Sequence, residues 1–112
     1  MAKLNEITDE NFKKEVLENP KPYVVTYSAL SYCQPCQQLH RILENEVLNH
    51  PITNEVNLGT VAVEDKGINI STQAGVRGVP TTIIYKNGER ISEKVGSVPA
   101  QTFIDWVKSS IA

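Results

Sequence analysis

The segment TTIIYKNGERISEKVG, residues Thr81 to Gly96, constrains the fold more than any other part of the chain. Two strand-like runs flank the dipeptide Asn87-Gly88. An Asn-Gly pair readily takes the positive φ angles that a two-residue hairpin turn requires. We therefore expect an antiparallel β-hairpin here, and the other elements must pack around it.

The segments before and after the hairpin alternate between strand-like and helical patterns. We expect two buried strands, YVVTY at residues 23–27 and GTVAVED at residues 59–65. We expect four helices: ITDENFKKEVLENPKP capped by Thr8 or Asp9, a second from Pro35 to near His50, a short third around residues 71–74, and PAQTFIDWVKSSI. Alternation of strands and helices indicates parallel strands with helical crossovers. Together with the hairpin, it predicts an α/β fold with a central mixed β-sheet flanked by helices on both faces.

The size and charge of the chain narrow the classes of function. At 112 residues, the chain is expected to form a single domain over residues 1–112. The net charge is −2 and no run of Lys or Arg stands out, which argues against nucleic acid as a partner. No stretch approaches the length of a bilayer span, and the N-terminus has no apolar signal segment. We therefore expect a cytoplasmic monomer that does not bind a membrane.

The chain has two cysteines, Cys33 and Cys36, in the segment SALSYCQPCQQLH between a predicted strand and a predicted helix. Such a pair can cycle between dithiol and disulfide, hold half of a zinc site, or form a static clip. A static clip across so short a loop would constrain little of the unfolded chain. At a helix N-terminus, free amide groups and the helix dipole stabilise a thiolate and lower a thiol pKa below about 8.5. The position favours redox exchange, with Cys33 as nucleophile, Cys36 as resolving thiol and Pro35 holding the turn between them.

A zinc site is the less favoured interpretation of the same cysteines. Four ligands would be needed, and the chain offers at most Cys33, Cys36, His40 and His50. Histidine ligands in such sites usually stand about three to five residues apart. His40 and His50 are farther apart, within and just past one predicted helix. Gathering all four side chains around one ion would break that helix, so no metal site is expected.

With these residues in place, the chain resembles the thioredoxin family over nearly its whole length. The segment YCQPC is similar to the family's Trp-Cys-Gly-Pro-Cys motif, and GVRGVPTTIIYKNGERISEKVG is similar to the family's substrate loop and hairpin. The resemblance implies a thioredoxin fold and a cis peptide bond between Val79 and Pro80. It also implies a substrate groove bordered by Tyr32, Gln34, Pro35, Val79, Pro80 and Gly96.

The activity implied by the resemblance is thiol-disulfide exchange that reduces protein disulfides through Cys33 and Cys36. The electrons would come from a reductase of the thioredoxin-reductase kind, with no bound cofactor other than the redox-active disulfide. An oxidase or isomerase of the same fold is the close alternative, and a glutaredoxin-like activity is weaker because no glutathione site is recognisable. A non-catalytic binding module with this fold is the alternative from another class, although binding alone would not need Cys36.

The chain departs from the family pattern in and around the motif. Thr26 stands where the family has a buried Asp, and Val63 stands where it has a neighbouring Lys. The joint absence is consistent, since the loss of one partner would strand a buried charge. The alignment also places one extra residue before the motif. Four further departures are Ser28 and Tyr32 for two Trp residues, Gln34 for Gly, and Arg41 for a Pro in the helix.

These departures predict disulfide exchange with altered proton handling and an altered redox potential. Without a buried acid, deprotonation of Cys36 would rely on water, on the departing thiolate of Cys33 or on His40. We also expect no proline kink in the helix at Arg41.

Overall fold

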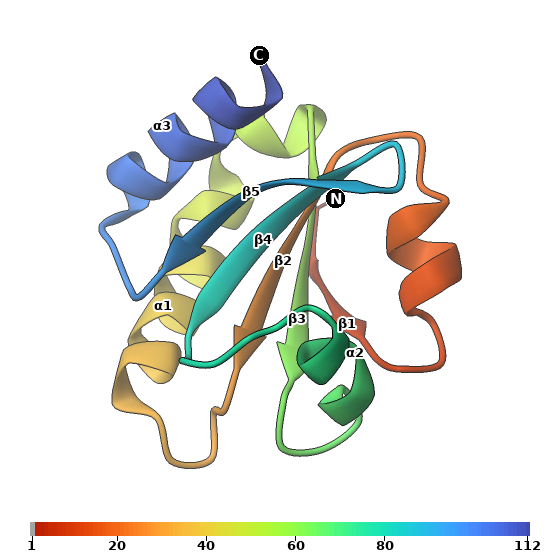
Figure 1. The fold of residues 1–112 in the computed structure, drawn as a ribbon. Helices are drawn as coiled ribbons and strands as arrows, with labels where there is room; N and C mark the ends of the chain where they lie inside the picture. Colours follow the sequence, from red (N-terminus) through yellow and green to blue (C-terminus); the bar gives the residue numbers. More distant parts are fainter. Residues whose placement is uncertain (1) are drawn as a thin grey trace.

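The central sheet has the strand order β1-β3-β2-β4-β5 in a computed structural model that describes residues 2–112 (Figure 1). The strands are β1 (Leu4–Ile7), β2 (Tyr23–Ser28), β3 (Asn57–Ala62), β4 (Thr81–Lys86) and β5 (Glu89–Val95). The helices are α1 (Gln34–Asn45), α2 (Ile68–Gln73) and α3 (Ala100–Ile111), with shorter turns η1 (Lys13–Leu17), η2 (Val47–Asn49) and η3 (Pro51–Asn54). β1 and β2 run parallel to β3, whereas β4 runs antiparallel to β2 and β5. The predicted mixed sheet is confirmed.

Strand β2 lies at the centre of the sheet, and each of its residues is buried. Successive side chains of a strand point to opposite faces, so β2 contributes to two separate cores. Val24 belongs to one core, and Val25 and Tyr27 belong to the other. The β-branched and aromatic run that predicted this strand therefore reflects burial on both faces.

Helices α1 and α3 cover one face of the sheet (Figure 1). Leu39 and Leu43 of α1 pack with Phe103, Ile104 and Val107 of α3 against apolar residues of β2, β3 and β4. The helix predicted for the segment PAQTFIDWVKSSI is confirmed as α3.

The turn η1 and helix α2 cover the opposite face (Figure 1). Val16 of η1 and Ile70 of α2 pack there against Tyr27 and Tyr85, whose hydroxyl oxygens lie 2.6 Å apart. Burial raises the pKa of both Tyr27 and Tyr85 above the usual value, so the hydroxyl pair stays protonated and hydrogen-bonded at neutral pH.

The predicted hairpin is confirmed as β4 and β5. Asn87 and Gly88 both have positive φ angles, 55° and 80°, as a tight two-residue turn of this kind requires. The ladder contains a register shift between Ile84 and Tyr85.

The N-terminal region differs from the sequence-based expectation. Residues 4–7 form the edge strand β1, which was not predicted, and Ile7 belongs to this strand instead of a helix. The helical turn covers only Lys13–Leu17. Thr8 does close a local turn, because its hydroxyl oxygen accepts the N–H of Asn11 at 3.3 Å. Asp9 instead accepts the N–H groups of Asn69 and Ile70 and caps α2, far away in the sequence.

Three other predicted boundaries are also shifted. Helix α1 ends at Asn45 and the chain continues in the 3₁₀ turns η2 and η3, whereas a single helix to near His50 was expected. Strand β3 spans Asn57–Ala62 instead of residues 59–65, because its register is set by pairing with both β1 and β2. Helix α2 begins earlier than expected, at Ile68. Within residues 2–112, no helix is long and apolar enough to cross a membrane.

Candidate active site

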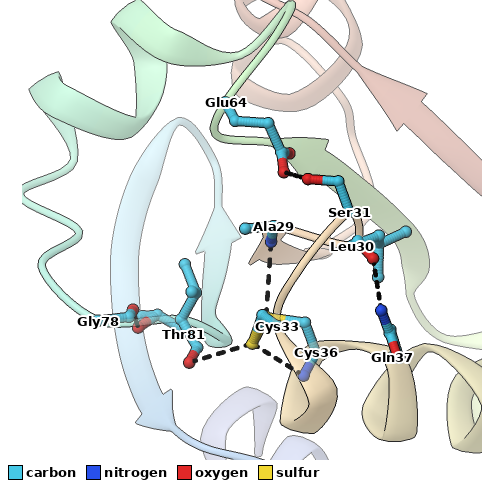
Figure 2. The surroundings of a disulfide bond; sticks show 10 residues. Ala29, Leu30, Ser31, Cys33, Cys36, Gln37, Glu64, Gly78 and Thr81 are labelled. Atoms are coloured by element: carbon cyan, nitrogen blue, oxygen red, sulfur yellow. Dashed lines mark hydrogen bonds between the residues drawn. A yellow bond between two sulfur atoms is a disulfide. The ribbon is translucent and has the colours of Figure 1, made fainter.

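Cys33 lies between the end of β2 and the start of α1, and it is the N-cap residue of α1. Its backbone is extended, with φ −94° and ψ 108°, and its Sγ accepts the N–H of Cys36 at 3.1 Å (Figure 2). Cys33 and Cys36 form a disulfide with their Cα atoms 5.2 Å apart. Pro35 occupies the first turn of α1, where a missing N–H costs nothing. The arrangement places one sulfur against the free amide groups of a helix N-terminus, where a thiolate is stabilised.

The two sulfur-bearing residues differ in access to solvent. Cys33 keeps 8% of its surface exposed and Cys36 keeps none. Ala29 packs against both cysteines, and its N–H points at the Sγ of Cys36 from 3.5 Å. Val63 and Val79 complete this small apolar cluster. Cys33 is therefore the cysteine that a substrate can contact, and Cys36 lies beneath it in apolar surroundings.

The loop before β4 forms the other wall of the site. The peptide bond between Val79 and Pro80 is cis, which confirms the expectation from the resemblance. The carbonyl oxygen of Val79 lies 3.8 Å from the Sγ of Cys33. Gly96, with φ 93°, donates its N–H to the carbonyl oxygen of Pro80 at 2.8 Å. The structure thus brings Val79, Pro80 and Gly96 together beside Cys33.

Three of the predicted groove residues lie on the surface next to Cys33. Tyr32 is 71% exposed, and Gln34 and Pro35 are also exposed. All six predicted groove residues therefore gather at the end of the sheet that carries the disulfide.

The turn before Cys33 holds contacts that the sequence did not reveal. The N–H groups of Tyr32 and Cys33 both donate to the carbonyl oxygen of Ala29, so residues 29–33 form a closed turn. The hydroxyl of Ser31 donates to a carboxylate oxygen of Glu64 at 2.7 Å (Figure 2). The side-chain amide of Gln37 donates to the carbonyl oxygen of Leu30 at 2.7 Å. Ser31 and Glu64 are far apart in the chain, and nothing in the sequence pattern pairs them.

Thr26 and Val63 form no charged pair, as their identities predict. Thr26 is buried, and its hydroxyl oxygen lies 3.0 Å from that of Thr82 on the neighbouring strand. Val63 packs as a partly buried apolar side chain against Ala29 and the cysteines. Neither Thr26 nor Val63 has a side chain that could accept a proton from Cys36.

A cavity of about 130 Å³ lies beside the turn before Cys33. Ser28 and Leu30 line it together with Thr60, and the carboxylates of Glu6 and Glu64 belong to its wall. The cavity is separated from the cysteines by the backbone around Ala29, whose neighbours on both sides line it. The last residue of β2, Ser28, therefore lies between the sheet and this cavity.

Within residues 2–112, neither histidine side chain is hydrogen-bonded to a cysteine. His40 lies 3.4 Å from a carboxylate oxygen of Glu44 on the same helix. The Nδ1 of His50 accepts the N–H of Ile52 and caps η3. Among residues 2–112, no group of three or more His, Cys, Asp or Glu side chains is placed to hold a metal ion. Helix α1 is continuous across Arg41, as expected without a proline there.

Comparison with known proteins relates this site to one family. The family model described as Thioredoxin matches residues 3–109. The thioredoxin of Rickettsia felis is 34% identical over 107 residues, covering 96% of this chain and 98% of the relative. Thioredoxin 1 of Synechococcus elongatus is 32% identical over 96 residues, 86% of each chain.

A solved structure gives the same result for the fold. The thioredoxin of Malassezia sympodialis superposes with a TM-score of 0.86 and 25% identity, over 100% of this chain and 94% of that one. The predicted thioredoxin fold is confirmed, and the spacing of Cys33 and Cys36 fits the family's paired-cysteine active site. This chain belongs to the thioredoxin family of thiol-disulfide oxidoreductases, and it is an enzyme of the protein disulfide reductase class.

Proposed function

We propose that the chain reduces protein disulfides, with Cys33 as nucleophile and Cys36 as resolving thiol. The observation that carries this assignment is the difference in position of the two sulfurs. Cys33 keeps 8% of its surface exposed at the N-terminus of α1, and Cys36 is fully buried one helical turn later. The attacking thiol must meet a large substrate, whereas the resolving thiol needs to reach only its neighbour.

The proposed exchange has two steps that start from the reduced dithiol. The Cys33 thiolate attacks one sulfur of the substrate disulfide, the substrate S–S bond breaks, and the released substrate sulfur takes up a proton. Cys36 then loses its proton and attacks the Sγ of Cys33. The mixed disulfide breaks, the second substrate thiol leaves with a proton, and Cys33 and Cys36 are oxidised to the disulfide.

We assign substrate binding to the groove around Tyr32, Gln34, Pro35, Val79, Pro80 and Gly96. Within residues 2–112, neither the N–H nor the C=O of Val79 takes part in a backbone hydrogen bond. An extended substrate segment can pair with these free groups, as in the addition of a strand to a sheet edge. Exposed Tyr32 offers an aromatic surface on the other side of Cys33.

The electron donor proposed for this cycle is a reductase of the thioredoxin-reductase kind, acting in the cytoplasm on a monomer without a prosthetic group. Attack of such a donor on the more accessible cysteine, Cys33, opens the disulfide and restores the dithiol. The substrates are proteins whose disulfides can enter the groove beside Cys33.

Reduction of insulin disulfides by dithiothreitol is expected to accelerate when the chain is added, and Cys33→Ser is expected to abolish the acceleration. The reduction potential of the Cys33–Cys36 pair gives the direction. A value near about −270 mV supports a reductase, and a value near about −120 mV would make the chain an oxidant. No acceleration by the unmodified chain would contradict the proposed activity.

The rate of exchange is expected to be slow at neutral pH and to rise steeply as the pH increases. Cys36 sits in apolar surroundings with the Ala29 N–H as its one hydrogen-bond donor among residues 2–112, and His40 is turned to Glu44. Burial in such a cluster disfavours a thiolate. Single-turnover resolution rates between about pH 6 and pH 9 measure this directly, beside a thioredoxin that has a buried Asp at the place of Thr26. Identical profiles for the two proteins would refute the expectation.

A further inference from the structure

We propose that Arg41 selects substrates with an acidic residue near the disulfide, by binding its carboxylate in a hollow along the first turns of α1. The inference rests on the proposed reduction of protein disulfides and adds the substrate class. The hollow has a volume of about 400 Å³ and is lined by Gln34, Pro35, Gln37, Gln38 and Arg41. We call it the α1 hollow.

The α1 hollow begins at the active site itself. Gln34 and Pro35 lie between the two cysteines, and the other lining residues follow in the next turns of the same helix. A substrate bonded to Cys33 has to run along one of the surfaces that border it. The α1 hollow is one such surface.

The chemistry of the α1 hollow suits a peptide with a negative charge. Gln34 and Gln38 make no side-chain hydrogen bond within residues 2–112, whereas Gln37 is held by Leu30. A free primary amide offers both donors and an acceptor to a peptide backbone. Arg41 is exposed and is the only charged residue of the lining.

The guanidinium of Arg41 is free to bind a partner. It forms no ion pair or hydrogen bond with the described residues, and the nearby Glu44 lies beside His40. A planar guanidinium matches a carboxylate in a bidentate geometry. A carboxylate is therefore the substrate group that best complements this position.

The charges around Cys33 are distributed unevenly, and this distribution favours one direction for an acidic substrate segment bonded to Cys33. The turn before Cys33 holds the carboxylate of Glu64 at Ser31, on the side of the loop between β3 and α2. Arg41 lies on the side of α1. An acidic substrate residue is repelled from the first side and attracted to the second, so charge orients the substrate along α1.

Helix geometry gives the position of the acidic residue. Arg41 follows Cys33 by about 12 Å along the helix axis, at about 1.5 Å per residue. An extended substrate covers that distance in about three to four residues, at roughly 3.3 Å each. We expect the acidic residue at that separation from the attacked cysteine.

The test compares peptide disulfides that are identical except for Glu, Gln or Lys at this separation. The reduced chain is expected to react with the Glu peptide with a kcat/KM about three- to tenfold above that for the Gln peptide, mainly through KM. The Lys peptide is expected to be the slowest. The preference is expected to shrink as salt is raised from about 0.05 to 0.5 M, because the pair is exposed.

Two variants that each lose one positive charge distinguish a direct contact of Arg41 with the substrate from an effect of the net charge of the chain. Arg41→Gln is expected to react equally with the Glu and Gln peptides. Arg77→Gln removes an exposed arginine that does not line the α1 hollow, and it is expected to keep the preference.

The outcomes are distinct. Equal reaction of the unmodified chain with Glu and Gln peptides would overturn the inference, and so would a preference that survives in Arg41→Gln or disappears equally in Arg77→Gln. If the chain reduces none of the peptides and does not accelerate insulin reduction, the proposed function itself fails. Reduction of all peptides without discrimination leaves the proposed function standing and removes Arg41 from substrate selection.

Discussion

Replacing Cys36 with Ser is expected to stop turnover and to leave substrates covalently attached to Cys33. Cys36 is fully buried and its sulfur is bonded to that of Cys33 in the disulfide, so Cys36 is positioned to attack Cys33 and not a distant substrate sulfur. A serine hydroxyl keeps the shape of the site but cannot displace a thiol from a disulfide. The mixed disulfide formed by Cys33 then has no internal route to resolution.

Mass spectrometry of Cys36→Ser mixed with a peptide disulfide measures this outcome. We expect one peptide thiol per chain, bonded to Cys33 and removed by dithiothreitol. Cys33→Ser is the matched control and is expected to capture no peptide, because Cys36 is closed to a substrate. Capture by Cys33→Ser, or turnover by Cys36→Ser without added thiol, would reverse or remove the assigned roles.

Replacing Thr26 with Asp is expected to lower the free energy of unfolding by about 3–5 kcal/mol at pH 8, as an uncompensated buried charge does. Thr26 is 2% exposed, and the Thr82 hydroxyl is its one side-chain partner within residues 2–112. One hydroxyl cannot satisfy both oxygens of a carboxylate. Within residues 2–112, no basic side chain is hydrogen-bonded to Thr26, and Val63, which the resemblance aligns with the family's Lys, is apolar.

The destabilisation by Thr26→Asp is expected to depend on pH in one direction. Burial raises the pKa of a carboxyl in the folded chain above the unfolded value of about 3.9. The penalty is therefore smallest below about pH 4, where the group is protonated in both states. It grows as the pH rises toward the folded-state pKa and is complete above it.

Urea unfolding of the oxidised variants between pH 4 and pH 8 tests this prediction. Thr26→Asn has the same size and does not titrate, so it supplies the cost of a buried polar group alone. We expect the difference in unfolding free energy between the Asp and Asn variants to widen with pH. A constant difference would show that the site accepts a carboxylate without penalty.

Much of the fold was predictable where local pattern and tertiary role agree. A run of β-branched and aromatic residues predicted that β2 is buried, and the pair Asn87-Gly88 predicted the hairpin turn. The spacing of Cys33 and Cys36 before a helical pattern likewise placed the site at the start of α1. In each case, the residues that define the element also carry its main interaction.

The sequence was a poor guide where an element depends on distant partners. Residues 4–7 have little strand character of their own and become β1 because they pair with β3. Asp9 fits a local helix cap, yet its carboxylate binds the start of α2. The contact between Ser31 and Glu64 joins the turn before Cys33 to the loop after β3, two segments that meet only in the folded chain.

The place of β2 in the strand order has a consequence for the synthesis of the chain. Its two neighbours, β3 and β4, both follow it in sequence, and β4 ends at Lys86. A ribosome adding about 5–20 residues per second makes the about 50 residues after Cys36 in roughly 3–10 s. During that interval, the two thiols emerge on a nascent chain whose central strand has no second neighbour, and β4 has to dock before the Val79–Pro80 loop covers them. Until β4 pairs with β2, the two cysteines therefore lack the Val79 side of the apolar cluster that surrounds them in the folded chain.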